Sequence, residues 1–141
     1  KDGTKKMSKS DPSDLSRINL TDSKDQIINK IKKAKTDNDP LPEDDKLLKQ
    51  RPEVENLLGI YSSLSDQSLN SSIVEFSGKN FSVFKEKLAD LVVEKMSPIS
   101  NEINKLLKDN NYIDTILKEG SEKANSIASK KIEEMKKIIG F

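Results

Sequence analysis

The chain has 141 residues, 33% hydrophobic and 35% charged, which is enough for one folded domain with an economical core and a densely charged surface. Cysteine and histidine are absent, which excludes disulfides, thiolate metal sites and imidazole chemistry within these residues and suits a reducing compartment. The net charge of +1 means that any binding to nucleic acid must depend on local basic patches.

The first 22 residues predict irregular structure, because Gly3 and Pro12 interrupt a stretch with little hydrophobic periodicity. A helix is predicted to follow, since Ser23 and Gln26 form a capping-box pattern. The apolar stripe of this helix comprises Ile27, Ile28, Ile31 and Ala34. Its basic flank comprises Lys30, Lys32, Lys33 and Lys35.

Two shorter helices are predicted in the middle of the chain, after a polar connection over residues 36–49 that holds two prolines and an acidic cluster. Pro52 suits the first turn of the next helix. The inward residues of that helix are Val54, Leu57, Leu58, Tyr61 and Leu64. A further helix follows Ser65 and ends at Gly78, with Leu69, Ile73, Val74 and Phe76 as its apolar residues.

Two longer helical segments complete the chain. Asn80 caps the first, and Pro98 either kinks it or starts a new helix. The last segment covers residues 112–139, with Gly120 as a candidate break. Five or six helices without a convincing strand predict an all-α fold, a helical bundle. No apolar run approaches the length needed to cross a bilayer.

Lysine and serine crowd the opening stretch, KDGTKKMSKS. The residues alone allow two interpretations, a solvated basic loop or a loop that closes over phosphate. In the second, the lysine ammonium groups and the serine hydroxyls bind the oxygens of a polyphosphate. Ser8 and Ser10 then donate hydrogen bonds to phosphate oxygens.

Residues 6–10 spell KMSKS, the signature loop of class I aminoacyl-tRNA synthetases, and the chain resembles the bacterial-type tryptophanyl-tRNA synthetases. The similarity runs in order through residues 6–12, 18–23, 31–37, 56–65, 78–85 and 122–129. The resemblance implies ATP as a substrate with Mg²⁺ accompanying it, tRNA(Trp) and tryptophan as partners, a cytoplasmic location and a homodimeric parent enzyme. It implies that ATP is bound by Lys6, Met7, Ser8, Lys9 and Ser10. It also implies that Lys6 and Lys9 are catalytic and stabilise the negative charge that develops on the departing pyrophosphate, on a loop whose flexible lysine stems let it swing in and release product.

The resemblance also divides the chain into a loop and linker over residues 1–22 and a helical anticodon-binding domain over residues 23–141. The family's Rossmann domain, tryptophan pocket and histidine-containing ATP motif are missing from these residues. We therefore expect this C-terminal piece to be unable to form tryptophanyl-adenylate alone. The chain departs from the family pattern over residues 40–50, which are longer and more acidic, and at Lys35, which replaces a usually apolar residue.

Candidate tRNA contacts are the basic flank, Lys30, Lys32, Lys33 and Lys35, with a solvated charged face as the competing interpretation. Tyr112 is the candidate for stacking on an unpaired base. Phe81, Phe84 and Tyr61 share helical spacing with aliphatic neighbours and are predicted to lie in the core. No metal site is predicted. Two other functions stay open, a free-standing helical interaction module with a lysine-rich tail and the related region of a tyrosyl-tRNA synthetase.

Overall fold

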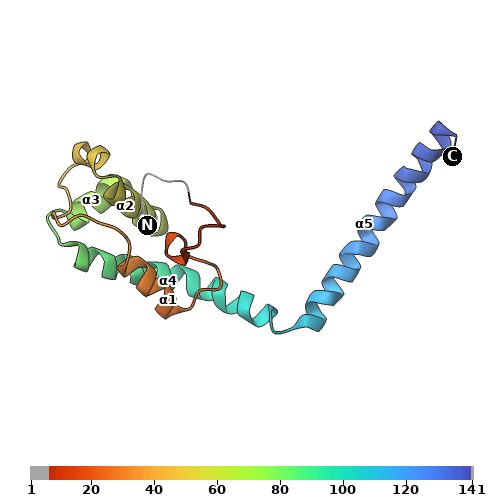
Figure 1. Ribbon diagram of the computed structural model, residues 1–141, viewed down its shortest axis with the longest axis horizontal. Coiled ribbons are helices and arrows are strands. Elements are labelled where there is room, and N and C mark those ends of the chain that lie inside the picture. The colour runs from red at the N-terminus through yellow and green to blue at the C-terminus, as the bar shows by residue number, and fades with distance from the viewer. Residues whose placement is uncertain (1–6, 141) are drawn as a thin grey trace. The chain divides into compact units, whose positions relative to one another are not determined.

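The computed structural model describes residues 7–140, and within that range it is helical with no strand (Figure 1). The elements in chain order are the 3₁₀ helix η1 (Asp14–Ser16), α1 (Lys24–Lys32), the 3₁₀ helix η2 (Asp45–Gln50), α2 (Pro52–Leu64), α3 (Leu69–Phe76), α4 (Phe81–Leu106) and α5 (Asn110–Ile139). The all-α prediction is therefore confirmed. None of the helices in this range is both long and apolar enough to cross a membrane.

The chain divides into two compact units, Lys1–Asn101 and Glu102–Phe141. The boundary lies inside α4, so the first unit holds η1 to most of α4, and the second holds the last residues of α4 together with α5. The expected functional boundary at residue 22 falls within the first unit.

The start of α1 forms as the sequence predicts. The Gln26 backbone N–H donates to Ser23 Oγ at 3.3 Å, and the Ser23 backbone N–H donates to Gln26 Oε1 at 2.8 Å. This capping box satisfies donors at the helix end that have no partner within the helix. Ile27 and Ile31 are buried behind it, and Ile28 and Ala34 pack against the same core. The predicted inward stripe is confirmed.

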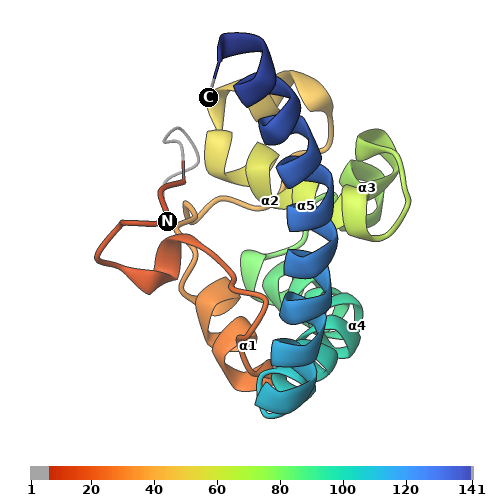
Figure 2. The ribbon, with the colours of Figure 1, turned by 90° about the vertical axis from the view of Figure 1, so that its right-hand side faces the viewer.

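An aromatic cluster lies at the centre of the first unit. The rings of Tyr61 and Phe76 lie edge to face at 4.8 Å, and those of Phe76 and Phe84 at 4.9 Å. These three residues come from α2, α3 and α4, and α2 and α3 lie side by side in both views of the ribbon (Figures 1 and 2). Phe81 is also buried, so the prediction that Phe81, Phe84 and Tyr61 belong to the core is confirmed.

The connection over residues 36–49 is less polar in its packing than the sequence predicts. Leu41 and Leu48 are each only 2% exposed and belong to the core. The Leu41 backbone N–H donates to the Lys79 carbonyl, and the Gly78 N–H donates to the Leu41 carbonyl, both at 3.0 Å. These backbone bonds tie the connection to the turn between α3 and α4. Val74, one of the four apolar residues from which α3 was predicted, is 74% exposed and lies outside the core.

Neither of the two candidate helix breaks interrupts its helix. Pro98 lies inside α4, and Gly120 lies inside α5. The Asn80 carbonyl accepts from the backbone N–H groups of Val83 and Phe84 at the start of α4. At the start of α5, Asp109 Oδ1 accepts from the Tyr112 N–H at 3.0 Å. No residue of α5 is buried, so helix packing around a core is confined, among the described residues, to the first unit.

Candidate functional site

The part of the KMSKS sequence that the structure describes is an exposed turn. Met7, Ser8, Lys9 and Ser10 are all exposed, and Met7 is 59% exposed. Ser8 Oγ and Ser10 Oγ lie 3.0 Å apart, and the Asp11 backbone N–H donates to the Ser8 carbonyl at 3.2 Å. Lys6, the other predicted catalytic residue, lies outside the described residues. The turn presents one ammonium and two hydroxyl groups at the surface.

Arg17 holds the base of this turn. Its Nη1 donates to the Ser8 carbonyl at 3.4 Å and to the Asp11 carbonyl at 3.2 Å. Its Nη2 forms an ion pair with Asp14 Oδ1 at 3.2 Å. The Ser13 backbone N–H adds a bond to Asp11 Oδ1 at 2.8 Å, which shapes the next turn. One guanidinium therefore connects the loop backbone to a carboxylate on η1, a task that its planar fork of donors suits.

The same carboxylate connects Arg17 to a buried lysine. Lys30 is 7% exposed and forms ion pairs with Asp14 and, at 2.6 Å, with Asp22. Burial alone lowers the pKa of Lys30, but the hydrogen bonds to the two carboxylates outweigh it and raise that pKa. The Lys30 ammonium in turn lowers the pKa of Asp14, with the Asn19 amide assisting. Lys30 and Asp14 are therefore both charged at neutral pH.

Asn19 closes the network from the linker side. Its backbone N–H donates to Asp22 Oδ2 at 2.8 Å, and its Nδ2 donates to Asp14 Oδ1 at 2.9 Å. We call these five residues, Asp14, Arg17, Asn19, Asp22 and Lys30, the loop anchor. It ties the exposed turn to α1 through contacts that the sequence analysis did not identify.

The structure corrects the assignment of Lys30 to an exposed basic flank. Lys30 stands three residues after Ile27 and one before Ile31, so it lies on the inward face of α1. That position in the apolar stripe is the one signal in the sequence that could have shown it to be buried. A charged lysine is costly to bury, and at this position the carboxylates of Asp14 and Asp22 compensate its charge.

The remaining predicted basic residues differ from one another. Lys32 and Lys33 are exposed near the end of α1, whereas Lys35 forms an ion pair with Glu53 at 3.0 Å. Lys85 of α4 contacts the segment that follows α1, where its Nζ donates to the Ala34 carbonyl at 2.6 Å. Burial lowers the pKa of Lys85. In the second unit, Tyr112 is 52% exposed, as predicted.

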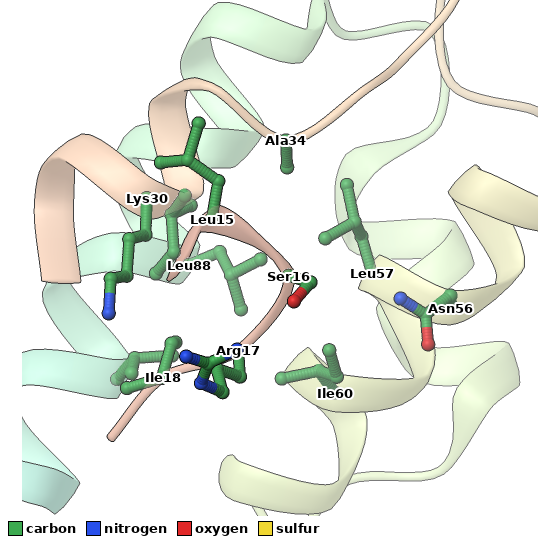
Figure 3. Close-up of a pocket in the computed structure, with 12 residues that line it drawn as sticks. Leu15, Ser16, Arg17, Ile18, Lys30, Ala34, Asn56, Leu57, Ile60 and Leu88 are labelled. Carbon is green, nitrogen blue, oxygen red and sulfur yellow. The ribbon is translucent and has the colours of Figure 1, made fainter. Parts of the chain in front are cut away.

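A pocket of about 290 Å³ adjoins the loop anchor (Figure 3). Its walls come from residues 15–18, α1, α2 and α4, and most are aliphatic. Figure 3 shows Arg17 and Ile18 on one side, with Asn56 and Ile60 of α2 on the other. Arg17 and Lys30, its two charged lining residues, already bind the carboxylates of the anchor. The pocket lies between residues 15–18 and α2, and both of its charged lining residues are already in ion pairs.

The amino-acid sequence of the chain matches a known protein family. The family model described as tRNA synthetases class I (W and Y) matches residues 1–102, and the chain belongs to this family. Across all 141 residues it is 56% identical to the tryptophan–tRNA ligase of Agrobacterium fabrum and 55% identical to that of Rhizobium meliloti. It is 48% identical to the tryptophan–tRNA ligase of Rickettsia felis.

These matches cover the whole of this chain but only part of each relative. The chain spans 40% of the Agrobacterium and Rhizobium proteins and 42% of the Rickettsia protein. The predicted resemblance to bacterial tryptophanyl-tRNA synthetases is confirmed.

Proposed function

We propose that this chain is the C-terminal part of an ATP-dependent tryptophan–tRNA ligase. Residues 1–22 are then the loop and linker of the catalytic domain, and residues 23–141 are the helical tRNA-binding domain. The observation that carries the proposal is the exposed turn at residues 7–10 of the KMSKS sequence, held at its base by Arg17 of the loop anchor. The family match over residues 1–102 supports it, because it joins the lysine-rich opening to the helices that follow. A tail on an unrelated interaction module does not account for that continuity.

The chemistry of the turn suits the activation of an amino acid. The tryptophan carboxylate attacks the α-phosphorus of ATP, the bond from that phosphorus to the bridging oxygen breaks, and pyrophosphate leaves with the charge. Lys9, together with Lys6, stabilises that developing charge, while Ser8 and Ser10 donate hydrogen bonds to phosphate oxygens. Ammonium and hydroxyl groups stabilise the transition state more than the ground state because the charge at the leaving group increases as the bond breaks.

The other components of the reaction follow the same proposal. Mg²⁺ accompanies ATP, but residues 7–10 carry no carboxylate, so their donors suit phosphate oxygens and we assign no metal ligand among them. Tryptophan and the rest of ATP are bound by residues beyond these 141, in a homodimeric, cytoplasmic enzyme. These residues alone are then inactive in adenylate formation.

For tRNA(Trp), the contacts that we propose are Lys32 and Lys33, with Lys35 beside them and Tyr112 in the second unit. Lys32, the last residue of α1, and Lys33, which follows it, are both exposed, which supports contact with tRNA phosphates. Lys30 is left out of this set, because its charge is bound to Asp14 and Asp22. Lys35 already bonds to Glu53, so a phosphate must compete with that carboxylate.

The proposal is tested by replacing Lys9 with alanine in the full-length protein that carries this chain. We expect tryptophan-dependent ATP–pyrophosphate exchange to fall about 100-fold or more, because one charge-stabilising donor is lost. The matched control is Lys24→Ala, which removes an exposed lysine at the start of α1. Unchanged exchange in Lys9→Ala would contradict the role of the loop. Exchange that depends on tyrosine instead of tryptophan would assign the chain to the tyrosyl enzymes.

A further inference from the structure

The exposed turn needs a fixed position if Lys9 is to reach one phosphate group. Met7 to Ser10 are exposed, and the bond between Ser8 Oγ and Ser10 Oγ lies within the turn itself. Arg17 supplies contacts from outside, since its Nη1 donates to the carbonyls of Ser8 and Asp11. The two carbonyls stand on either side of Lys9, so Arg17 holds both ends of the short segment that carries this ammonium.

Arg17 is itself fixed to the helical unit. The Asp14 carboxylate binds the Arg17 guanidinium through Oδ1 and the Lys30 ammonium through Oδ2. Lys30 also binds Asp22. The side chains of Lys30 and Asp22 are only 7% and 5% exposed, so this end of the network is buried beside the core. The contacts form a continuous chain from the backbone of the turn to the interior of the first unit.

We propose that Arg17 is a positioning residue for the turn at residues 7–10. Its guanidinium holds the Ser8 and Asp11 carbonyls and is itself held by Asp14, which binds the buried Lys30. Arg17 thereby sets the position of the Lys9 ammonium. This inference rests on the proposed function, because it assigns Arg17 a role in the same reaction. Arg17 does not touch ATP in this account. It acts through Lys9.

This role predicts a particular kinetic signature. An ammonium that is displaced from the leaving group loses an interaction made mainly in the transition state, so kcat falls while KM for ATP changes little. A displacement of about 1 Å is enough to lower the rate about 100-fold. Arg17→Ala in the full-length protein is therefore expected to lower the kcat of tryptophan-dependent ATP–pyrophosphate exchange by about 10-fold to 100-fold. Arg17→Lys keeps the charge beside Asp14 but loses the fork, so it recovers only part of the rate.

Arg51 offers a matched control within the same unit. It also binds one carboxylate and two backbone carbonyls, since its Nε donates to Asp37 at 2.8 Å and its Nη1 and Nη2 donate to Pro40 and Asp39 at 2.7 and 3.0 Å. Arg51→Ala removes the same kinds of bond from a connection remote in sequence from the KMSKS turn. We expect it to lower the unfolding temperature at least as much as Arg17→Ala does, while kcat stays within about twofold.

A double-mutant cycle with Lys9→Ala separates this inference from the proposed function. If Arg17 acts through Lys9, the variant with both residues replaced is no slower than Lys9→Ala alone. Multiplied losses in the double variant would refute the positioning role, as would a fall in kcat that Arg51→Ala reproduces. If Lys9→Ala keeps full exchange activity, the proposed function fails, and the positioning role fails with it. If Lys9→Ala loses activity and Arg17→Ala does not, the positioning role alone is wrong.

Discussion

The buried lysine of the loop anchor allows a sharp test of the structure. In Lys30→Met the unbranched apolar stem is kept, but the ammonium between Asp14 and Asp22 is lost. Asp22 is 5% exposed, so its carboxylate then lies in the interior without a compensating cation. Breaking a buried ion pair in this way costs about 3–5 kcal/mol.

Two features of the structure place the expected cost at the lower end of that range. Asp22 still accepts from the Asn19 backbone N–H at 2.8 Å, and the Asp14 side chain is 50% exposed, so water solvates it. We therefore expect the free energy of unfolding of Lys30→Met to fall by about 3 kcal/mol. For a unit of about 100 residues this lowers the midpoint of urea unfolding by about 2 M.

The measurement is urea unfolding at pH 7, followed by circular dichroism at 222 nm. Lys32→Met is the matched control, because Lys32 is an exposed lysine on the same helix and its replacement should change stability by no more than about 0.5 kcal/mol. Adding Asp22→Asn to Lys30→Met removes the buried charge and should recover part of the loss. Equal stability of Lys30→Met and Lys32→Met would refute the buried pair.

Two further predictions concern pH and salt. Hydrogen bonding from Arg51 lowers the pKa of Asp37 below its ordinary 3.8, so its stabilisation is present above that pH and is lost as the pH falls further. Asp37→Asn should therefore lower stability at pH 7 by about 0.5 kcal/mol, with a gap that closes below pH 3.8 in acid unfolding; a constant gap would contradict this. For tRNA, Lys33→Ala should reduce the slope of log affinity against log salt by about 0.8, whereas exposed Lys49→Ala should not; equal slopes would remove Lys33 from the interface.

The helices were predictable where local signals agree with one another. The capping box at Ser23, the proline at the start of α2 and the spacing of Val54, Leu57 and Tyr61 each depend on neighbours within one or two turns. Pro98 and Gly120 were not decided by the sequence, because a proline or glycine inside a long helix costs stability that the rest of the helix can offset.

Long-range contacts were not predictable in the same way. Leu41 and Leu48 lie in a stretch of prolines and acidic residues, and no local period marks them as core. The backbone of Leu41 is bonded to the turn at residues 78–79, which is far away along the chain. For the same reason the KMSKS motif was visible in the sequence, whereas its connection through Arg17 was not.

The sequence by itself determined the helical class, the inward stripes of α1 and α2, and the chemistry of the lysine-rich turn, because each follows from residues close together along the chain. Only the tertiary structure decided which charged side chains are buried in ion pairs and which face solvent. Lys30, Lys32 and Lys33 occur within four positions, yet one is buried between two carboxylates and the others face solvent. The difference arises because the free energy of a charge depends on the groups that folding brings around it, and those groups come from the linker that precedes α1.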